Sequence, residues 1–329
     1  MPERNQTPVA VASRSFSRHP QLRAELLSRY ENVTFNDAGL SLAGDSLIDF
    51  LRGHPKAITA LERLDREVLA ALPELEVVSK YGVGLDMIDL KAMENQGVLL
   101  GWTGGVNRRS VAEVVISTAI ALLHRLPEGN LEVRGGGWRQ LRGKQLSGRV
   151  VGIVGCGHVG KEVAVLLRAF GCRVLAHDIR DFPEFYQAHQ VTPLGLEELL
   201  RSAEIVTIHL PLDHTTRDMF SAARLALMPP GAYLINAARG GIVDEAALKI
   251  MLKDGRLAGA AFDVFAVEPP QDLELLNLSN FFATPHLGGS TEEAILAMGR
   301  AAIAGLDQAR PVGEVMELAG IKPEKIPVS

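Results

Sequence analysis

Residues 150–160 read Val150-Val151-Gly152-Ile153-Val154-Gly155-Cys156-Gly157-His158-Val159-Gly160. The apolar run before Gly155 predicts a buried strand, and Lys161 to Phe170 continue with helical periodicity. In a strand–turn–helix unit of this kind, Gly155 permits the tight turn, Gly157 lets a pyrophosphate approach the backbone, and Gly160 allows close packing of helix and strand. The free amides and partial positive charge of the helix N-terminus favour phosphate groups. The stretch therefore predicts a Rossmann domain that binds a dinucleotide.

Asp178 gives the second part of this fingerprint. It lies 18 residues beyond Gly160, at the end of the next predicted strand. A carboxylate there accepts the hydroxyls of the adenine ribose and repels a 2′-phosphate, which predicts NAD rather than NADP, although Arg180 leaves some use of NADP open. We interpret Cys156 as a small loop residue rather than a nucleophile. The expected cofactor contacts from this loop and strand are Gly155, Gly157, His158, Val159, Gly160 and Asp178.

The composition is that of a globular protein with more than one domain. At 329 residues, with 47% hydrophobic and 22% charged residues, the chain has enough apolar material for two cores. A net charge of −5 disfavours nucleic acid as the main partner. Cys156 and Cys172 are too few for a disulfide framework or a metal site, so we expect no metal and a reducing, cytoplasmic location. Val114–Leu123 is too short to span a membrane, and Met1–Thr7 lacks the features of a secretory signal.

Short Val- and Ile-rich runs alternate with helical segments, which predicts an α/β fold with parallel sheets. In the first third we expect strands at Val9–Ser13, Ala57–Ala60 and Val77–Lys80, and a helix at Gln21–Tyr30. From Arg149 a second α/β series begins. Its six expected strands are Val150–Val154, Arg173–Asp178, Ile205–Leu210, Tyr233–Asn236, Gly259–Asp263 and Phe281–Ala283.

Two Ser-x-x-Glu patterns predict helix starts. Ser110 with Glu113 precedes the apolar helix, where we place a domain crossing, and Ser290 with Glu293 precedes a long helix over residues 291–306. Asp244 is expected to cap another helix.

Three ionisable residues follow the last three predicted strands. Arg239 comes after the strand ending at Asn236, Glu268 after the next strand, and His286 after the last. Ligands of open α/β sheets bind at the carboxyl ends of the strands. Hydride transfer to a ketone needs a proton donor, a role that suits histidine, and a neighbouring carboxylate favours the imidazolium and fixes its tautomer. A guanidinium matches a substrate carboxylate and the adjacent carbonyl. Each of these residues alone could be structural, but together they predict a dehydrogenase site.

Several motifs in this order resemble the D-isomer-specific 2-hydroxyacid dehydrogenases, nearest to the phosphoglycerate dehydrogenase branch. The likeness covers roughly residues 45 to 310. Besides the glycine loop, it rests on Tyr81–Asp86, Gly105–Glu113, His209–Pro211, Asn236–Asp244, Asp263–Pro269 and Thr284–Ala294.

The resemblance implies two doubly wound domains. Residues 1–106 and 290–329 would form a flavodoxin-like substrate-binding domain, into which the NAD-binding Rossmann domain, residues 107–289, is inserted. It implies Arg239 as the residue that orients the substrate, His286 as acid/base and Glu268 as its partner. Further cofactor contacts would come from His209, Pro211, Ala237, Arg239, Asp263, His286 and Gly288. The substrate would be bound by Tyr81, Gly82, Val83, Gly84, Asn107, Arg239 and His286. The helix from Ser110 and the arm Leu131–Trp138 resemble the family's dimer contacts, which implies a homodimer.

Departures from the family pattern concern the substrate. Thr59 and Lys80 stand where phosphoglycerate dehydrogenases usually have arginines, which weakens a specific expectation of 3-phosphoglycerate. We expect the serine-binding regulatory domains of longer relatives to be absent. The segment Ser13–Arg18 is expected as a loop whose Arg14 and Ser15 face the interdomain cleft and bind a second polar group of the substrate.

The predicted function is NAD-dependent interconversion of a small D-2-hydroxy acid and its 2-oxo acid. Formate dehydrogenases of the superfamily typically carry Gln where Glu268 stands, so Glu268 argues against that activity. Phosphite oxidation remains an alternative. An NAD(H)-sensing binding protein or corepressor on the same fold is a rival of another class, because such proteins can keep the three residues.

Overall fold

The computed structural model describes residues 4–319 and divides into two compact units. Unit 1 comprises Met1–Asn107 and Glu292–Ser329, and unit 2 comprises Arg108–Thr291. From the sequence we expected these boundaries at 106/107 and 289/290.

Unit 1 contains a five-stranded sheet with the order β2-β1-β3-β4-β5, in which every neighbouring pair is parallel. This is the flavodoxin-like order of a doubly wound sheet. The strands are β1 (Val9–Val11), β2 (Val33–Phe35), β3 (Lys56–Thr59), β4 (Val77–Lys80) and β5 (Leu99–Gly101).

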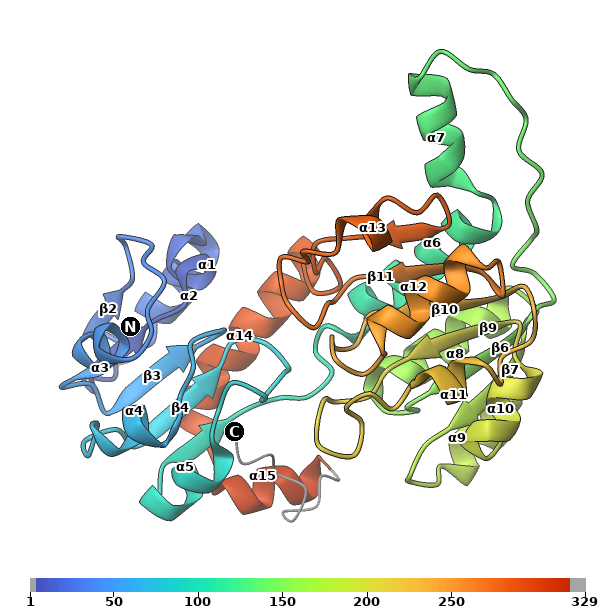
Figure 1. The fold of residues 1–329 in the computed structure, drawn as a ribbon. Helices are drawn as coiled ribbons and strands as arrows, with labels where there is room; N and C mark the ends of the chain where they lie inside the picture. The colour runs from blue at the N-terminus through green and yellow to red at the C-terminus, as the bar shows by residue number, and fades with distance from the viewer. Residues whose placement is uncertain (1–3, 320–329) are drawn as a thin grey trace. The chain divides into compact units, whose positions relative to one another are not determined.

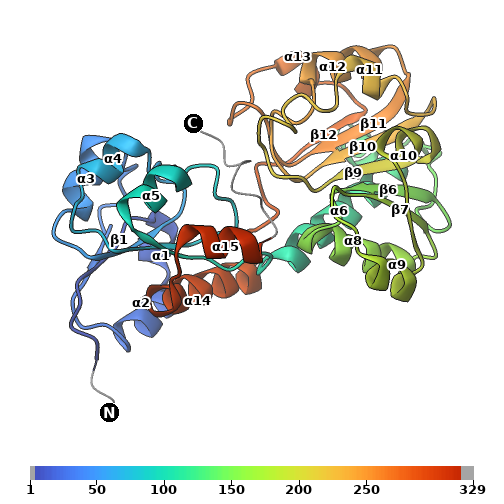
Figure 2. The ribbon, with the colours of Figure 1, turned by 90° about the horizontal axis from the view of Figure 1, so that it is seen from below.

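Helices cover both faces of this sheet (Figures 1 and 2). One face packs against α1 (Arg14–Arg18), α2 (Pro20–Leu27) and α14 (Glu292–Gln308). The other packs against α3 (Asp45–Leu51), α4 (Arg66–Ala70), α5 (Leu90–Gln96) and α15 (Val312–Leu318).

Helix α14 packs on the sheet of unit 1 with its backbone close to that of β5. A side chain at Gly101 would collide with the backbone of Gly305, and one at Gly305 would collide with Ser79. Ser79 Oγ donates a hydrogen bond of 2.6 Å to the carbonyl oxygen of Ala302 in α14. Helix α14 therefore packs directly against the sheet that the first hundred residues form.

Unit 2 contains a seven-stranded parallel sheet with the order β12-β11-β10-β9-β6-β7-β8. The glycine loop follows β6, inside the sheet, where the strand order reverses. All six expected strands are present, and β8 is an additional one. The strands are β6 (Val150–Val154), β7 (Arg173–His177), β8 (Val191–Pro193), β9 (Ile205–Ile208), β10 (Ala232–Asn236), β11 (Leu257–Phe262) and β12 (Phe281–Ala283). The predicted α/β class with two doubly wound parallel sheets is confirmed.

Helices also cover both faces of the second sheet (Figure 2). The first face carries α6 (Arg108–Leu123), α8 (His158–Ala169) and α9 (Pro183–His189). The second carries α10 (Leu196–Ser202), α11 (Ala222–Leu225), α12 (Glu245–Lys253) and α13 (Leu273–Leu276). Figure 1 shows α7 (Leu126–Arg134) and the loop after it standing clear of this sheet.

The local predictions had different outcomes. Asp244 caps α12 by accepting a 2.9 Å hydrogen bond from the amide of Ala247, as expected. The capping box at Ser110 was wrong, because α6 begins at Arg108 and Ser110 lies inside its first turn, while Glu113 pairs with Arg109 at 2.7 Å. The expected loop Ser13–Arg18 was also wrong: Ser13 accepts from the amide of Phe16 and starts α1.

The long C-terminal helix begins at Glu292, one residue later than predicted. Between residues 4 and 319 no individual helix has the length and apolar character of a membrane span. Among the described helices, only the pair α6 and α7, bent by 62°, meets those criteria when taken together.

Candidate functional site

The glycine loop between β6 and α8 leaves open space at one of its three glycines. Gly155 has φ +98°, and a side chain there would collide with the carbonyl of His209; one at Gly160 would collide with the carbonyl of Gly155. A Cβ at Gly157 would meet only Arg180 Nη2, at 3.8 Å. Gly155 and Gly160 are therefore required by the packing of the loop, whereas the space at Gly157 is available to a ligand. Together with the uncapped N-terminus of α8, this arrangement fits the pyrophosphate of a dinucleotide.

Two side chains of the loop carry no charge at neutral pH. Cys156 is fully buried, and burial raises the pKa of its thiol to about 11. Burial, followed by the positive charges of Arg108, Arg180 and Lys161, lowers the pKa of His158. The thiol of Cys156 is therefore not a nucleophilic thiolate at neutral pH, and the imidazole of His158 offers no positive charge to a phosphate.

Asp178 follows β7 and is tied to the glycine loop. Its Oδ2 accepts a 2.7 Å hydrogen bond from the amide of Cys156, and its Oδ1 accepts one of 2.9 Å from the amide of Arg180. The carboxylate is thereby fixed at the end of the strand beside the loop. Each oxygen keeps a second lone pair that could accept a ribose hydroxyl.

His209 lies at the end of β9. Its Nε2 is 2.9 Å from Thr207 Oγ1, and burial lowers its pKa to about 3. The imidazole is therefore neutral at physiological pH and cannot serve as a charged phosphate ligand. Pro211 follows it on the same edge of the sheet.

The loop after β10 holds Arg239. Asn236, the last residue of the strand, donates through Nδ2 to the carbonyl of Arg239 at 2.9 Å and accepts from the amide of Ala238 at 3.1 Å. Gly240 lies so close to the backbone of Phe265 that any side chain would overlap it. The Arg239 loop therefore packs directly on the loop that carries Glu268.

Glu268 and His286 are in contact across two loops. His286 Nδ1 lies 3.0 Å from Glu268 Oε2, and Glu268 Oε1 accepts from the amide of Phe265 at 3.1 Å. His286 adopts φ +55°, a rare conformation for a side chain of this kind. Within residues 4–319 its Nε2 makes no hydrogen bond, so that atom is available to a substrate.

Asp263 holds the loop that carries His286. Its Oδ1 accepts from Thr284 Oγ1 at 2.6 Å and from the amide of Leu287 at 2.7 Å, while Oδ2 accepts from the amide of Gly288 at 2.8 Å. The residue is 4% exposed. The resemblance implied a cofactor contact for Asp263, which stays a prediction; its three hydrogen bonds give it an anchoring role. The roles of Asn236 and Thr284 were missed, because only their position at strand ends distinguished them.

The loops of unit 2 that carry predicted residues share one edge. They follow β6, β7, β9, β10, β11 and β12, and all these strands are parallel. Ala237 follows β10 directly, and Gly288 lies next to Asp263. Contact of these residues with a cofactor stays a prediction.

In unit 1, the turn after β4 carries the expected substrate residues. Gly82 has φ +126°, and the carbonyl of Val83 accepts from Trp102 Nε1 at 3.0 Å. Within the described residues the amides of Val83 and Gly84 have no hydrogen-bond partner. Tyr81 is 7% exposed, with its ring 5.4 Å from that of Phe16, so it can offer a ligand little more than its backbone.

Buried polar groups lie next to this turn. Lys80 donates through Nζ to the carbonyl oxygens of Ala60 and Tyr81. In the described part of the chain, Thr59 Oγ1 and Asn107 Oδ1 are buried without a hydrogen-bond partner. Thr59 pairs in register with Lys80 on the neighbouring strand.

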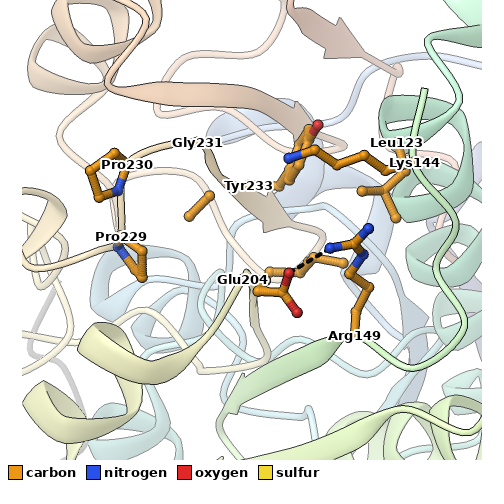
Figure 3. A pocket seen from close by; sticks show the side chains of 10 residues that line it. Leu123, Lys144, Arg149, Glu204, Pro229, Pro230, Gly231 and Tyr233 are labelled. Carbon is orange, nitrogen blue, oxygen red and sulfur yellow. Dashed lines mark hydrogen bonds and ion pairs between the residues drawn. The ribbon is translucent and has the colours of Figure 1, made fainter. Parts of the chain in front are cut away.

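A cavity of about 90 Å³ lies elsewhere in unit 2 (Figure 3). It is lined by the first residues of β9 and β10, Ile205 and Ala232, and by the ion pair of Arg149 with Glu204 at 2.6 Å. It therefore opens at the amino edge of the sheet, opposite the glycine loop. Over residues 4–319, no cluster of three or more His, Cys, Asp or Glu side chains could hold a metal ion.

Comparisons with known proteins agree with this arrangement. The family model described as "D-isomer specific 2-hydroxyacid dehydrogenase, NAD binding domain" matches residues 116–288. The chain is 36% identical to D-3-phosphoglycerate dehydrogenase of Sus scrofa over 239 residues, which cover 72% of this chain and 45% of that protein. It is 36% identical to the Haemophilus influenzae protein of the same name over 273 residues, 80% of this chain and 66% of that protein. The chain thus spans about half to two thirds of these curated relatives.

Solved structures match over nearly the whole chain. A protein of Thermus thermophilus has a TM-score of 0.80 at 31% identity, covering 97% of this chain and 99% of that one. A glyoxylate reductase from Paecilomyes thermophila has a TM-score of 0.83 at 25% identity, covering 94% and 95%. The chain therefore belongs to the D-isomer-specific 2-hydroxyacid dehydrogenases, and its residues 116–288 match the NAD-binding domain of that family.

Proposed function

We propose that this protein interconverts a small D-2-hydroxy acid and its 2-oxo acid with NAD as the hydride carrier. The observation that carries the proposal is the 3.0 Å contact between His286 Nδ1 and Glu268 Oε2, at the sheet edge that also carries Arg239 and the glycine loop. This contact orients the imidazole and leaves its Nε2 available at the ligand-binding edge.

NAD, when bound, supplies or accepts the hydride at the substrate carbon. During reduction His286 gives a proton from Nε2 to the substrate oxygen, and during oxidation it takes that proton back. Glu268 binds Nδ1–H and so places the mobile proton on Nε2. Arg239 orients the substrate through its carboxylate and carbonyl oxygens, since a guanidinium presents two parallel donors.

The substrate carboxylate is proposed to bind at the turn Gly82–Gly84. The unpartnered amides of Val83 and Gly84 can donate to an anion, and the positive φ of Gly82 gives the turn its shape. Asn107, whose buried Oδ1 lacks a partner within the described residues, is a further candidate for a substrate contact.

The surroundings of this turn argue against a phosphorylated substrate. Lys80 is 3% exposed, its ammonium bonds backbone carbonyls, and Thr59 adds no charge. A phosphate needs cationic ligands with free donors. Arg14, exposed in the first turn of α1, is proposed to bind a second polar group of the substrate. If Arg14→Ala leaves the KM of every active substrate unchanged, that role is rejected.

The test of the function is turnover of NADH with glyoxylate, hydroxypyruvate and 3-phosphohydroxypyruvate. We expect oxidation of NADH with the first two and a kcat/KM at least about tenfold lower with the phosphorylated acid, because one charged contact contributes that much. NADH binding without turnover of any 2-oxo acid would instead support a nucleotide-sensing protein and contradict the proposal.

A further inference from the structure

The side chain of Arg180 lies over the glycine loop. A Cβ built on Gly157 would have Arg180 Nη2 as its neighbour, at 3.8 Å. Gly157 is the position at which a Rossmann loop allows the pyrophosphate to approach the backbone. The guanidinium therefore reaches the space that the pyrophosphate would occupy.

Contacts with Asp178 and Phe182 hold Arg180 in this place. Its amide donates to Asp178 Oδ1 at 2.9 Å, its Nε lies 3.9 Å from the same oxygen, and its Cζ lies 5.2 Å from the centre of the Phe182 ring. The side chain is nevertheless 41% exposed, so a ligand can reach the guanidinium. A positioned guanidinium loses less entropy on binding an anion than a mobile one.

The other charged groups around the loop are engaged differently. Arg108 lies 3.5 Å from Glu162, and the ammonium of Lys161 lies 3.6 Å above the Phe182 ring. His158, the loop's own basic side chain, has a lowered pKa and is neutral at physiological pH. Among the described residues, Asp178 Oδ1 lies 3.9 Å from Arg180 Nε, and Asp181 follows Arg180 in the sequence. Arg180 thus supplies positive charge at a loop whose own side chains carry none.

We propose that Arg180 is a pyrophosphate ligand of the NAD site, and not a residue that recognises the 2′-phosphate of NADP. An arginine after the acidic residue of a Rossmann fold is ordinarily expected to accept that 2′-phosphate. Here the carboxylate of Asp178 lies within 3.9 Å of the guanidinium and would repel a phosphate on the ribose, while Nη2 points to Gly157. The inference rests on the NAD domain and not on the proposed 2-oxo acid chemistry.

Affinities of NADH, NADPH and ADP-ribose for Arg180→Ala, measured by calorimetry without any substrate, test this directly. Loss of a charge-assisted contact predicts dissociation constants raised by roughly tenfold, and by a similar factor for all three ligands, because all contain the pyrophosphate. The dependence of the NADH dissociation constant on salt should also become shallower. The control is Arg173→Ala. Arg173 is exposed at the amino end of β7, the strand that precedes Arg180, so this variant loses the same charge at the opposite edge of the sheet. We expect each dissociation constant to change less than about twofold.

Two results would overturn the inference. Weaker binding of NADPH with unchanged binding of NADH would make Arg180 a 2′-phosphate contact, and unchanged binding of all three ligands would remove it from the site. Arg180→Lys keeps the charge without the two-pronged donor geometry and should give intermediate affinities. If circular dichroism shows that Arg180→Ala does not fold, the same three affinities are measured for Arg180→Lys and Arg180→Gln. We expect the larger loss of affinity for Arg180→Gln, which removes the charge. Because the readout is binding, absence of 2-oxo acid turnover leaves this test intact.

Discussion

Asp263 anchors the loop of His286 with three hydrogen bonds, to Thr284, Leu287 and Gly288. Asp263→Asn turns one acceptor oxygen into a donor that faces an amide. We expect the free energy of unfolding to fall by about 1–3 kcal/mol, the typical cost of an unsatisfied buried group, and kcat to fall as His286 loses its position. Urea unfolding and steady-state kinetics measure both. Asp254→Asn, at an exposed aspartate, is the control, and equal stability of the two variants would refute the anchoring role.

His209 makes the protein sensitive to acid. Burial lowers its pKa to about 3 in the folded state, against about 6.5 in the unfolded chain. Between pH 6.5 and pH 3 the imidazole binds a proton in the unfolded state but not in the folded state. The contribution of the neutral imidazole to the free energy of unfolding is therefore complete above pH 6.5 and decreases as the pH falls. The slope is at most about 1.4 kcal/mol per pH unit for one proton.

We therefore predict that His209→Asn loses less stability between pH 6.5 and 4.5 than the unchanged protein does. Urea unfolding at three pH values measures the difference. Parallel curves for the two proteins would show that the imidazole does not titrate in this way.

At the scale of elements, the loops after β10 and β11 depend on a backbone contact at Gly240. A Cβ there would overlap the backbone of Phe265, so Gly240→Ala must separate the loop of Arg239 from that of Glu268. We expect kcat/KM to fall by about 10–100-fold, the order expected when a catalytic group is displaced by about 1 Å. Gly195→Ala, where the Cβ meets open space, is the matched control. Similar kinetics for both variants would argue against this packing requirement.

The sequence predicted the strands with clear apolar runs and missed three of the short ones. Each strand of unit 2 with a Val- or Ile-rich run was placed correctly, and so was the cap at Asp244. The strands β2, β5 and β8 were missed; like β1 and β12, which were predicted, they have only three residues each, too few to show a clear period. The Ser110 motif failed because Arg108 and Arg109 already form the first turn of α6, where their side chains pair with Glu162 and Glu113.

For the candidate site, parallel strands made the shared edge predictable, since every strand end brings its loop to that edge. The positions of Arg239, Glu268 and His286 after neighbouring strands followed from this rule. The hydrogen bonds of Asn236 and Asp263 could not be predicted, because the sequence around a buried polar residue at a strand end does not reveal its partner. The same holds for Lys80, whose ammonium bonds carbonyls inside unit 1.

For the whole molecule, we propose that the arm around α7 joins two copies of the chain. Its residues Leu126, Leu131, Val133 and Trp138 are exposed, Trp138 to 83%. Apolar side chains gathered on one projecting element are typical of an interface. The double substitution Leu131→Glu and Val133→Glu should convert a dimer to a monomer in sedimentation experiments. Leu61→Glu, at an exposed leucine of unit 1, should not. A protein that is already monomeric at micromolar concentration would contradict the proposal.

Transfer of the substrate proton by His286 is tested most directly by comparing turnover with NADH binding in His286→Ala. Removal of a general acid typically costs about 10²–10⁴-fold in rate. We predict that kcat with an active 2-oxo acid falls by about 10³-fold while the NADH dissociation constant changes less than about twofold, and that His124→Ala, at an exposed histidine, behaves as the unchanged protein. A kcat of His286→Ala within about tenfold of normal would show that His286 does not transfer this proton.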